Sequence, residues 1–133
     1  MKKYPLYTLI DFHSSANKNG TLTMFDRKTV PFDIKRILTM HSMNENDIRG
    51  GHTHHITHQI LICTKGQCVI DLDNGKEKKS ITLSSPTQGI VLYPYVWHYM
   101  RNFKDDAILL VLASTDYDEK DYIRSYEDFL KFI

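Results

Sequence analysis

The sequence lacks the features that mark several common classes of protein. Its 17 Lys and Arg residues against 16 Asp and Glu leave a net charge of +1, without the basic excess of a nucleic-acid-binding domain. No apolar run approaches the roughly 20 residues that span a bilayer. No apolar stretch of signal-peptide length follows the first five residues. These absences predict a soluble, cytoplasmic protein that binds neither nucleic acid nor a membrane.

The chain also lacks the short motifs of redox chemistry and of nucleotide cofactors. Its two cysteines, Cys63 and Cys68, do not have the CxxC spacing of a redox pair, so we predict two small buried side chains beside a turn. There is no GxGxxG sequence and no phosphate-binding P-loop. The sequence therefore predicts no cofactor.

The hydrophobic pattern alternates with the two-residue period of β-strands. A chain of 133 residues with 41% hydrophobic residues is long enough to bury the core of one domain. Strands are predicted over residues 4–12, 21–25, 31–40, 59–63, 67–72, 81–83, 89–93 and 107–113, the last of them buried on both faces. Asn74-Gly75 indicates a hairpin, because this pair tolerates the positive φ angles of a type I′ turn.

The tail changes to a helical pattern. Hydrophobic residues recur there at helical spacing, at Tyr122, Tyr126, Phe129, Leu130 and Ile133. Asp118, which precedes them, is a preferred N-cap residue type, so a helix is predicted over about 118–132. Many short strands that close with one helix favour an all-β sandwich or barrel, in a single domain over residues 1–133.

Histidine is concentrated in one segment: four of the seven histidines lie between positions 52 and 58. His52 and His54 are two residues apart, so on a strand their imidazoles project from the same face. Burying such a pair inside a barrel would be costly without a function. A third histidine, His98, follows the turn-forming Pro94. Of the others, His13, His41 and His55 are expected at the surface or in loops, and His58 on the opposite face of the sheet.

This layout resembles the two-part signature of the cupin superfamily. The first part reads His52-x-His54, Gln59 and Gly66, and the second reads Gly89, Pro94, His98 and Asn102. Metal-binding cupins carry glutamate where this chain has Gln59, and the loss of that charge weakens cation binding. The resemblance implies a cupin jelly-roll barrel. A metal-dependent oxygenase that uses His52, His54 and His98 remains an alternative.

Most of the chain from about residue 20 onward is similar to one cupin family, the 3,4-ketoisomerases of dTDP-4-keto-6-deoxyhexoses. These enzymes act in the biosynthesis of 3-amino-3,6-dideoxy sugars. The matching pieces are Pro31-Phe32, Ile34-Lys35-Arg36, Arg49-Gly50, His52-x-His54, Gln59, Val96-Trp97-His98, Val111-Leu112-Ala113-Ser114 and Asp121-Tyr122-Ile123-Arg124. The resemblance implies a metal-independent homodimer, and an N-terminal strand exchanged between subunits would fit the long polar stretch after Phe12. It also implies that His52 and His54 transfer protons and that Arg49 is the family's arginine.

Moving a ketone from C4 to C3 requires a base that removes the C3 proton and an acid that returns a proton to C4. Imidazole suits both steps because its pKa of about 6.5 lies near neutral pH. We predict that His54 moves the carbon-bound proton and His52 serves the oxygens, or the reverse. The enediolate needs nearby positive charge, for which Arg49 is the candidate, with Tyr95 or Tyr99 behind it.

The substrate-binding prediction rests on the chemistry of a dTDP-linked sugar. Arg36 and Arg101 are candidates for its diphosphate, since arginine meets phosphate oxygens with two donors. Gln59, Tyr95 and His98 complete the predicted binding residues. Relatives carry tyrosines on the strand after Arg36, where this chain has Leu38-Thr39, so Tyr93, Tyr95 or Tyr99 is left to supply a phenol. A nucleotide-sugar 3,5-epimerase and a non-catalytic cupin that senses a small ligand are further alternatives.

Overall fold

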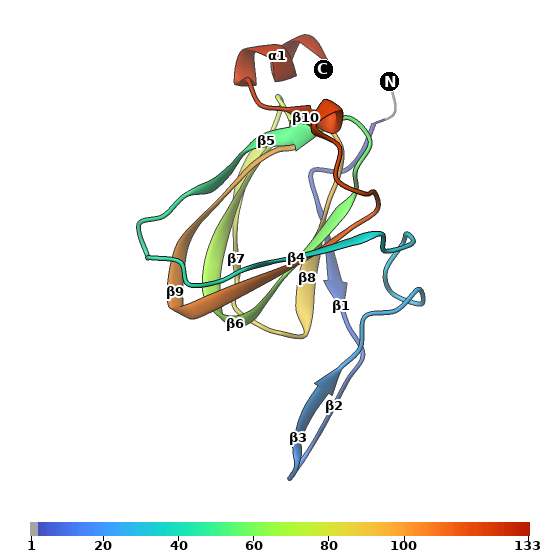
Figure 1. The fold of residues 1–133 in the computed structure, drawn as a ribbon, viewed down its shortest axis with the longest axis vertical. Helices are drawn as coiled ribbons and strands as arrows, with labels where there is room; N and C mark the ends of the chain where they lie inside the picture. The colour runs from blue at the N-terminus through green and yellow to red at the C-terminus, as the bar shows by residue number, and fades with distance from the viewer. Residues whose placement is uncertain (1–2) are drawn as a thin grey trace.

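The computed structural model describes residues 3–133. Eight antiparallel strands form one sheet that curls around an apolar interior (Figure 1). They are β1 (Thr8–Asp11), β4 (Arg36–Met40), β5 (Arg49–His54), β6 (Gln59–Asp73), β7 (Lys78–Leu83), β8 (Gln88–Leu92), β9 (Trp97–Ala113) and β10 (Tyr122–Ile123). The predicted all-β barrel with a short C-terminal helix is confirmed. No helix in this part of the chain has the length and hydrophobicity that a membrane crossing needs.

Two long strands, β6 and β9, join the two halves of the barrel. They pair from Gln59 opposite Ala113 to Asp73 opposite Trp97, and the register shifts three times between Cys63 and Val69. Residues 59–63 and 67–72, predicted as two strands joined by a turn, therefore belong to one bulged strand. Bulges bend a strand strongly, which lets one strand serve both halves. Gly66 is required there, because its φ is +67° and a Cβ would lie 2.2 Å from the carbonyl oxygen of Lys104.

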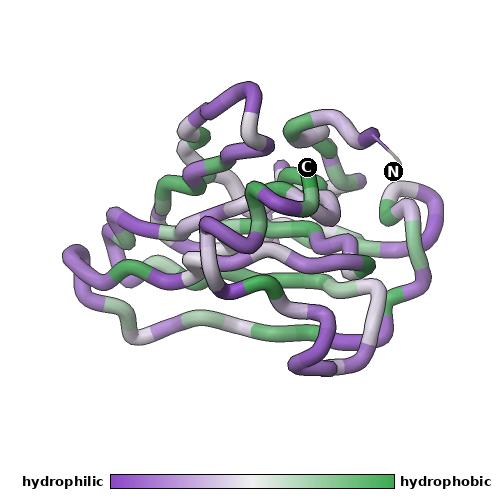
Figure 2. Tube along the Cα trace, turned by 90° about the horizontal axis from the view of Figure 1, so that it is seen from above, coloured by the Kyte–Doolittle hydropathy of each residue, from purple (hydrophilic) through white to green (hydrophobic). Residues whose placement is uncertain are grey.

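Side chains of β9 alternate between the interior and the outside of the barrel. His98 and Met100 are directly opposite Leu72 and Ile70, which belong to the interior core. The residues between and beside them, such as Arg101, face outward. Figure 2 shows the corresponding change between hydrophobic and hydrophilic residues along the strands. Farther along β9 the strand is packed on both faces, as predicted, because Leu112 belongs to a second apolar cluster outside the barrel.

The tail differs from the predicted helix over about 118–132. Asp118 caps only a short 3-10 helix (Glu119–Asp121), its side chain accepting a hydrogen bond from the backbone of Lys120. The chain then extends as β10, which pairs with β5 and gains ladder hydrogen bonds there. The helix α1 (Tyr126–Lys131) begins later, with Ser125 as its N-cap. Residues 122–123 therefore pair with the edge of β5 and do not join the helix.

The polar segment before Gly20 forms β2 (Ser14–Asn17), which pairs with β3 (Gly20–Thr23) in a hairpin that projects from the end of the barrel opposite α1 (Figure 1). The hairpin between β6 and β7 is confirmed, but its turn is not type I′, because Asp73 pairs with Lys78 and leaves a four-residue loop. Gly75 alone of these loop residues has a positive φ, and the Asn74 side chain accepts two backbone hydrogen bonds that hold the loop.

Candidate active site

Three histidines meet on the inner side of β5 and β9. His52 lies directly opposite His98 in the strand register. The ring centroid of His52 is 5.2 Å from that of His54 and 4.7 Å from that of His98, and the rings of His54 and His98 are 6.0 Å apart. The prediction that the His52 and His54 imidazoles share a face is confirmed. A bulge after Gly50 permits the close approach, since a Cβ at Gly50 would lie 2.7 Å from the His98 carbonyl oxygen.

Burial keeps these imidazoles neutral. Removal from water, and then the charge of Arg124, lowers the pKa of His52 to about 4. Removal from water, followed by the charges of His52 and Arg36, lowers the pKa of His54 to about 3. Burial also holds the pKa of His98 well below its usual value. All three rings are therefore free bases near neutral pH, ready to accept a proton.

The hydrogen bonds of the site leave several groups available to a ligand. His98 Nδ1 lies 3.1 Å from the Val96 carbonyl oxygen. A carbonyl can only accept, so Nδ1 carries the proton and Nε2 of His98 presents a lone pair. Five of the seven buried side-chain polar atoms without a partner in residues 3–133 belong to one set of residues: His52, His54, His98, Gln59 and Arg36.

Strand register places the last two of these residues on the inner face as well. Arg36 and Gln59 are both directly opposite Ala113 of β9, and the next inward positions, Leu38 and Leu61, belong to the interior core. An unsatisfied buried polar group costs about 1–3 kcal/mol. So many of them on one side of a barrel indicate a site that is completed by a polar ligand.

Tyr122, from the tail, packs directly on the histidine pair. Its ring centroid is 4.4 Å from that of His54 and 5.1 Å from that of His52. Its hydroxyl oxygen accepts a hydrogen bond from Arg36 Nη1 at 3.4 Å. The guanidinium of Arg124 covers the same ring at 4.4 Å from its centroid.

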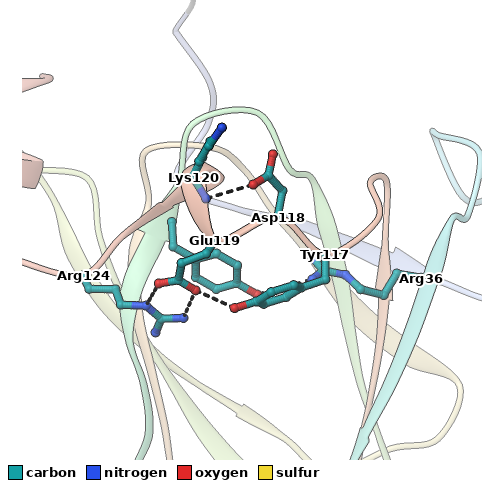
Figure 3. Close-up of polar contacts among 7 residues, drawn as sticks. Arg36, Tyr117, Asp118, Glu119, Lys120 and Arg124 are labelled. Carbon is teal, nitrogen blue, oxygen red and sulfur yellow. Dashed lines mark hydrogen bonds and ion pairs between the residues drawn. The ribbon is translucent and has the colours of Figure 1, made fainter.

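The two arginines belong to a polar network at the edge of the site (Figure 3). Glu119 accepts hydrogen bonds from Arg124 Nε at 2.6 Å and Nη2 at 2.9 Å, and from the Tyr117 hydroxyl at 2.6 Å (Figure 3). These donors, Arg124 first, lower the pKa of Glu119 to about 2, so the carboxylate is ionised. Arg36 lies over the Tyr117 ring, 5.7 Å from its centroid. The network thus holds two guanidinium groups next to the histidines.

Comparisons with known proteins show the family of this chain. A family described as "FdtA: WxcM-like, C-terminal" matches residues 6–133. The chain belongs to this FdtA family. It is 40% identical, over 126 residues, to a TDP-4-oxo-6-deoxy-α-D-glucose-3,4-oxoisomerase from Aneurinibacillus thermoaerophilus, covering 94% of this chain and 91% of that protein.

Solved structures of 3,4-ketoisomerases have the same fold as this FdtA-family chain. A histidine-to-asparagine variant of QdtA from Thermoanaerobacterium thermosaccharolyticum, in complex with TDP-4-keto-6-deoxyglucose, matches with a TM-score of 0.94 and 38% identity over 98% of this chain and 95% of that one. WlaRA, a TDP-fucose-3,4-ketoisomerase from Campylobacter jejuni, matches with a TM-score of 0.89 and 38% identity over 95% and 94%. The sugar epimerase NovW, 14% identical with a TM-score of 0.74, shares the fold alone.

The FdtA-family chain does not bring every predicted site residue to the histidines. Arg101 faces outward and pairs with Asp71, Nε to Oδ2 at 2.6 Å and Nη2 to Oδ1 at 3.1 Å. The Tyr95 hydroxyl lies 3.0 Å from His55 Nδ1, away from the site. Arg49 is exposed at the start of β5, and its side chain makes no hydrogen bond or ion pair within the described residues. Of the predicted residues, the structure gathers His52, His54, His98, Arg36 and Gln59 on the inner face.

Arg101 and Tyr99 could have been placed correctly from the sequence. They are three residues and one residue from His98, so on a strand neither can share its face. Tyr122 and Arg124 were missed because residues 118–132 were predicted as helix. The segment Asp121-Tyr122-Ile123-Arg124 could have indicated them, because Tyr122 and Arg124 are two residues apart, as two residues on one face of a strand are.

The histidines and Gln59 of the FdtA-family structure also bear on the alternative of a metal-dependent oxygenase. No group of three or more His, Cys, Asp or Glu side chains in residues 3–133 has the arrangement of a metal site. Gln59 contributes a neutral amide, which binds a cation more weakly than a carboxylate would. Nothing in the geometry favours an oxygenase.

Proposed function

We propose that this chain is a 3,4-ketoisomerase that converts a dTDP-4-keto-6-deoxyhexose into its 3-keto isomer, in the biosynthesis of 3-amino-3,6-dideoxy sugars. One observation carries the proposal: the neutral imidazoles of half-buried His52 and buried His54 have ring centroids only 5.2 Å apart, inside a barrel of the FdtA family. Two free bases on one face can act on two adjacent carbons of one sugar ring.

The reaction needs no net gain or loss of atoms or electrons. The C3 proton of the substrate is acidic because C3 adjoins the C4 carbonyl, and a neutral imidazole removes it to give an enediolate. A proton then returns to C4, and the proton of the C3 hydroxyl passes to the oxygen on C4 as the new carbonyl forms at C3. The negative enediolate favours protonation of the adjacent ring, which offsets the low pKa of His54 while the intermediate lasts.

Arg36 and Arg124 are proposed to bind the diphosphate of the substrate. Support comes from the electrostatics of the site, since both guanidinium groups lower the pKa of His54 and therefore lie close to it. Arg124 replaces Arg101, which Asp71 holds on the outer face. We assign no catalytic role to Arg49, because it is exposed and the charges that act on the histidines come from the other two arginines.

The sugar itself is proposed to contact His98 and Gln59. The Nε2 lone pair of His98 can accept a hydrogen bond from a sugar hydroxyl, and the unpaired Oε1 of Gln59 can do the same. Tyr95 is left out of this proposal, since its hydroxyl is engaged with His55.

We also propose that the enzyme is a cytoplasmic homodimer. The β2–β3 hairpin is almost fully exposed, and an isolated two-stranded hairpin is only marginally stable in water. Leu22 on this hairpin is 58% exposed, and Ile37 on β4 is 63% exposed. A second copy that covers these side chains would stabilise both surfaces. The unpaired thiols of Cys63 and Cys68 fit a reducing compartment.

The test is a proton NMR time course with dTDP-4-keto-6-deoxyglucose as substrate. The wild-type protein should convert it to a 3-keto sugar, and His52→Asn and His54→Asn should each reduce the rate by at least about 100-fold, the usual contribution of an acid–base group. His41→Asn, at an exposed site just after β4, is the matched control and should retain the wild-type rate. No conversion by the wild-type protein would overturn the proposal.

A further inference from the structure

Within residues 3–133, Tyr122 is the one phenol whose ring contacts the rings of His52 and His54, and the reaction proposed above gives it no role. It is directly opposite His54 in the β10–β5 register, and directly opposite residues on antiparallel strands point to the same face. The contacts of its ring with the rings of His54 and His52, at 4.4 and 5.1 Å, agree with that orientation.

The proton of the Tyr122 hydroxyl is available to a ligand. A guanidinium can only donate, so in the hydrogen bond between Arg36 Nη1 and Tyr122 the hydroxyl oxygen is the acceptor. The O–H of Tyr122 must therefore point elsewhere, and no other residue in the range 3–133 accepts a hydrogen bond from it. A hydroxyl that accepts from a cation is also a stronger donor, because consecutive hydrogen bonds polarise one another.

The enediolate needs such a donor. Burial keeps the three histidines neutral, and His98 uses its only N–H on the Val96 carbonyl. In each imidazole that acts as a base, the nitrogen that faces the carbon-bound proton presents a lone pair, which suits proton abstraction but does not stabilise an oxyanion. Tyr122 supplies the missing O–H within ring contact of both proposed bases.

We propose that Tyr122 donates a hydrogen bond to the substrate oxygen that becomes negative in the enediolate, so that it is a catalytic residue of the isomerase. The inference rests on the proposed ketoisomerase function and adds to it a third group that touches the reacting atoms. The proton stays on the phenol throughout, so no bond to Tyr122 forms or breaks. Besides its proposed contact with the diphosphate, Arg36 orients the Tyr122 hydroxyl through Nη1, and its Nε stays unpaired.

The experiment compares Tyr122→Phe with the wild-type enzyme. This variant removes the hydroxyl and keeps the ring that packs on His54. The loss of one oxyanion donor costs about 100- to 1,000-fold in kcat. Tyr122→Phe should therefore lose at least about 100-fold in kcat, while its affinity for TDP, measured by calorimetry, stays within about twofold. Retained TDP binding also shows that the variant is folded.

Tyr126→Phe is the matched control. It removes a phenol hydroxyl that donates to Asp73 at 2.7 Å on the outer face of the barrel, and it should keep the wild-type kcat. A Tyr122→Phe enzyme with kcat within about threefold of wild type, or with its loss confined to KM, overturns the role of the hydroxyl while the ketoisomerase function stands. A wild-type protein that does not convert the substrate overturns both.

Discussion

The buried, neutral histidines make the stability of the fold sensitive to acid. A histidine whose pKa is lower in the folded than in the unfolded chain binds fewer protons when folded, so stability falls as the pH drops below the unfolded pKa. For His54 the pKa is about 3 in the folded protein against the ordinary 6.5. Between pH 7 and pH 5 the unfolded histidine becomes protonated and the folded one does not. This difference costs about 2 kcal/mol of the free energy of unfolding.

Urea unfolding at pH 7, 6 and 5 measures this cost. Trp97 is 5% exposed, so its fluorescence should report the transition. His54→Asn should remove about 2 kcal/mol of the wild-type decline in the free energy of unfolding between pH 7 and pH 5. His41→Asn, which changes an exposed side chain, should leave the decline as it is. All samples need equal protein concentration, because dimerisation would change the apparent stability.

Two results would refute this reasoning. The first is a wild-type protein whose free energy of unfolding is the same at pH 7 and pH 5. The second is a His54→Asn variant that declines as steeply as wild type, which would mean that His54 already binds a proton in the folded state.

Three further predictions concern binding, backbone geometry and metal. Arg124→Gln should weaken TDP binding by about 10-fold or more in calorimetry, because it loses a charge-assisted hydrogen bond. Arg101→Gln should change the affinity by less than about twofold, since Asp71 holds that arginine on the outer face. Equal effects of the two changes would contradict the assignment. Gly50→Ala should lower the free energy of unfolding by at least about 1 kcal/mol, because φ at this residue is +88° and the new Cβ would lie 2.7 Å from the His98 carbonyl oxygen; an unchanged melting temperature would show that the bulge is not required. Prior treatment with EDTA should leave the turnover rate unchanged, whereas a metal-dependent oxygenase would lose its activity.

The strand periodicity was enough to predict an all-β sandwich or barrel and the face shared by His52 and His54. It worked because the face on which a side chain lies, for the two histidines as for the core residues, depends only on alternation along one strand. The periodicity did not predict the tail. The spacing of Tyr122, Tyr126 and Phe129 fits one continuous helix as well as it fits the short strand and later helix of the structure. The edge of β5 decides the outcome at residues 122–123, and an edge is a tertiary feature that no local pattern contains.

The same limit applies to the charged residues of the site. Arg36 and Arg101 look alike in the sequence, but Asp71 lies two strand positions from the residue opposite Arg101 and holds it outside the barrel. A hydrogen bond with Glu119 holds Arg124 at the site. Glu119 lies in the 3-10 helix, and this helix ends just before β10 begins. Pairings between distant segments thus determine which arginines can meet a substrate.

The measurement that tests the central claim most directly is the position of deuterium in product formed in D2O from dTDP-4-keto-6-deoxyglucose. An enediol that joins C3 and C4, formed by His52 and His54, predicts solvent deuterium at C3 or C4 of the sugar and none at C5. A 3,5-epimerase would place deuterium at C5. Deuterium at C5, or a substrate that remains unlabelled and unconverted, would contradict the account.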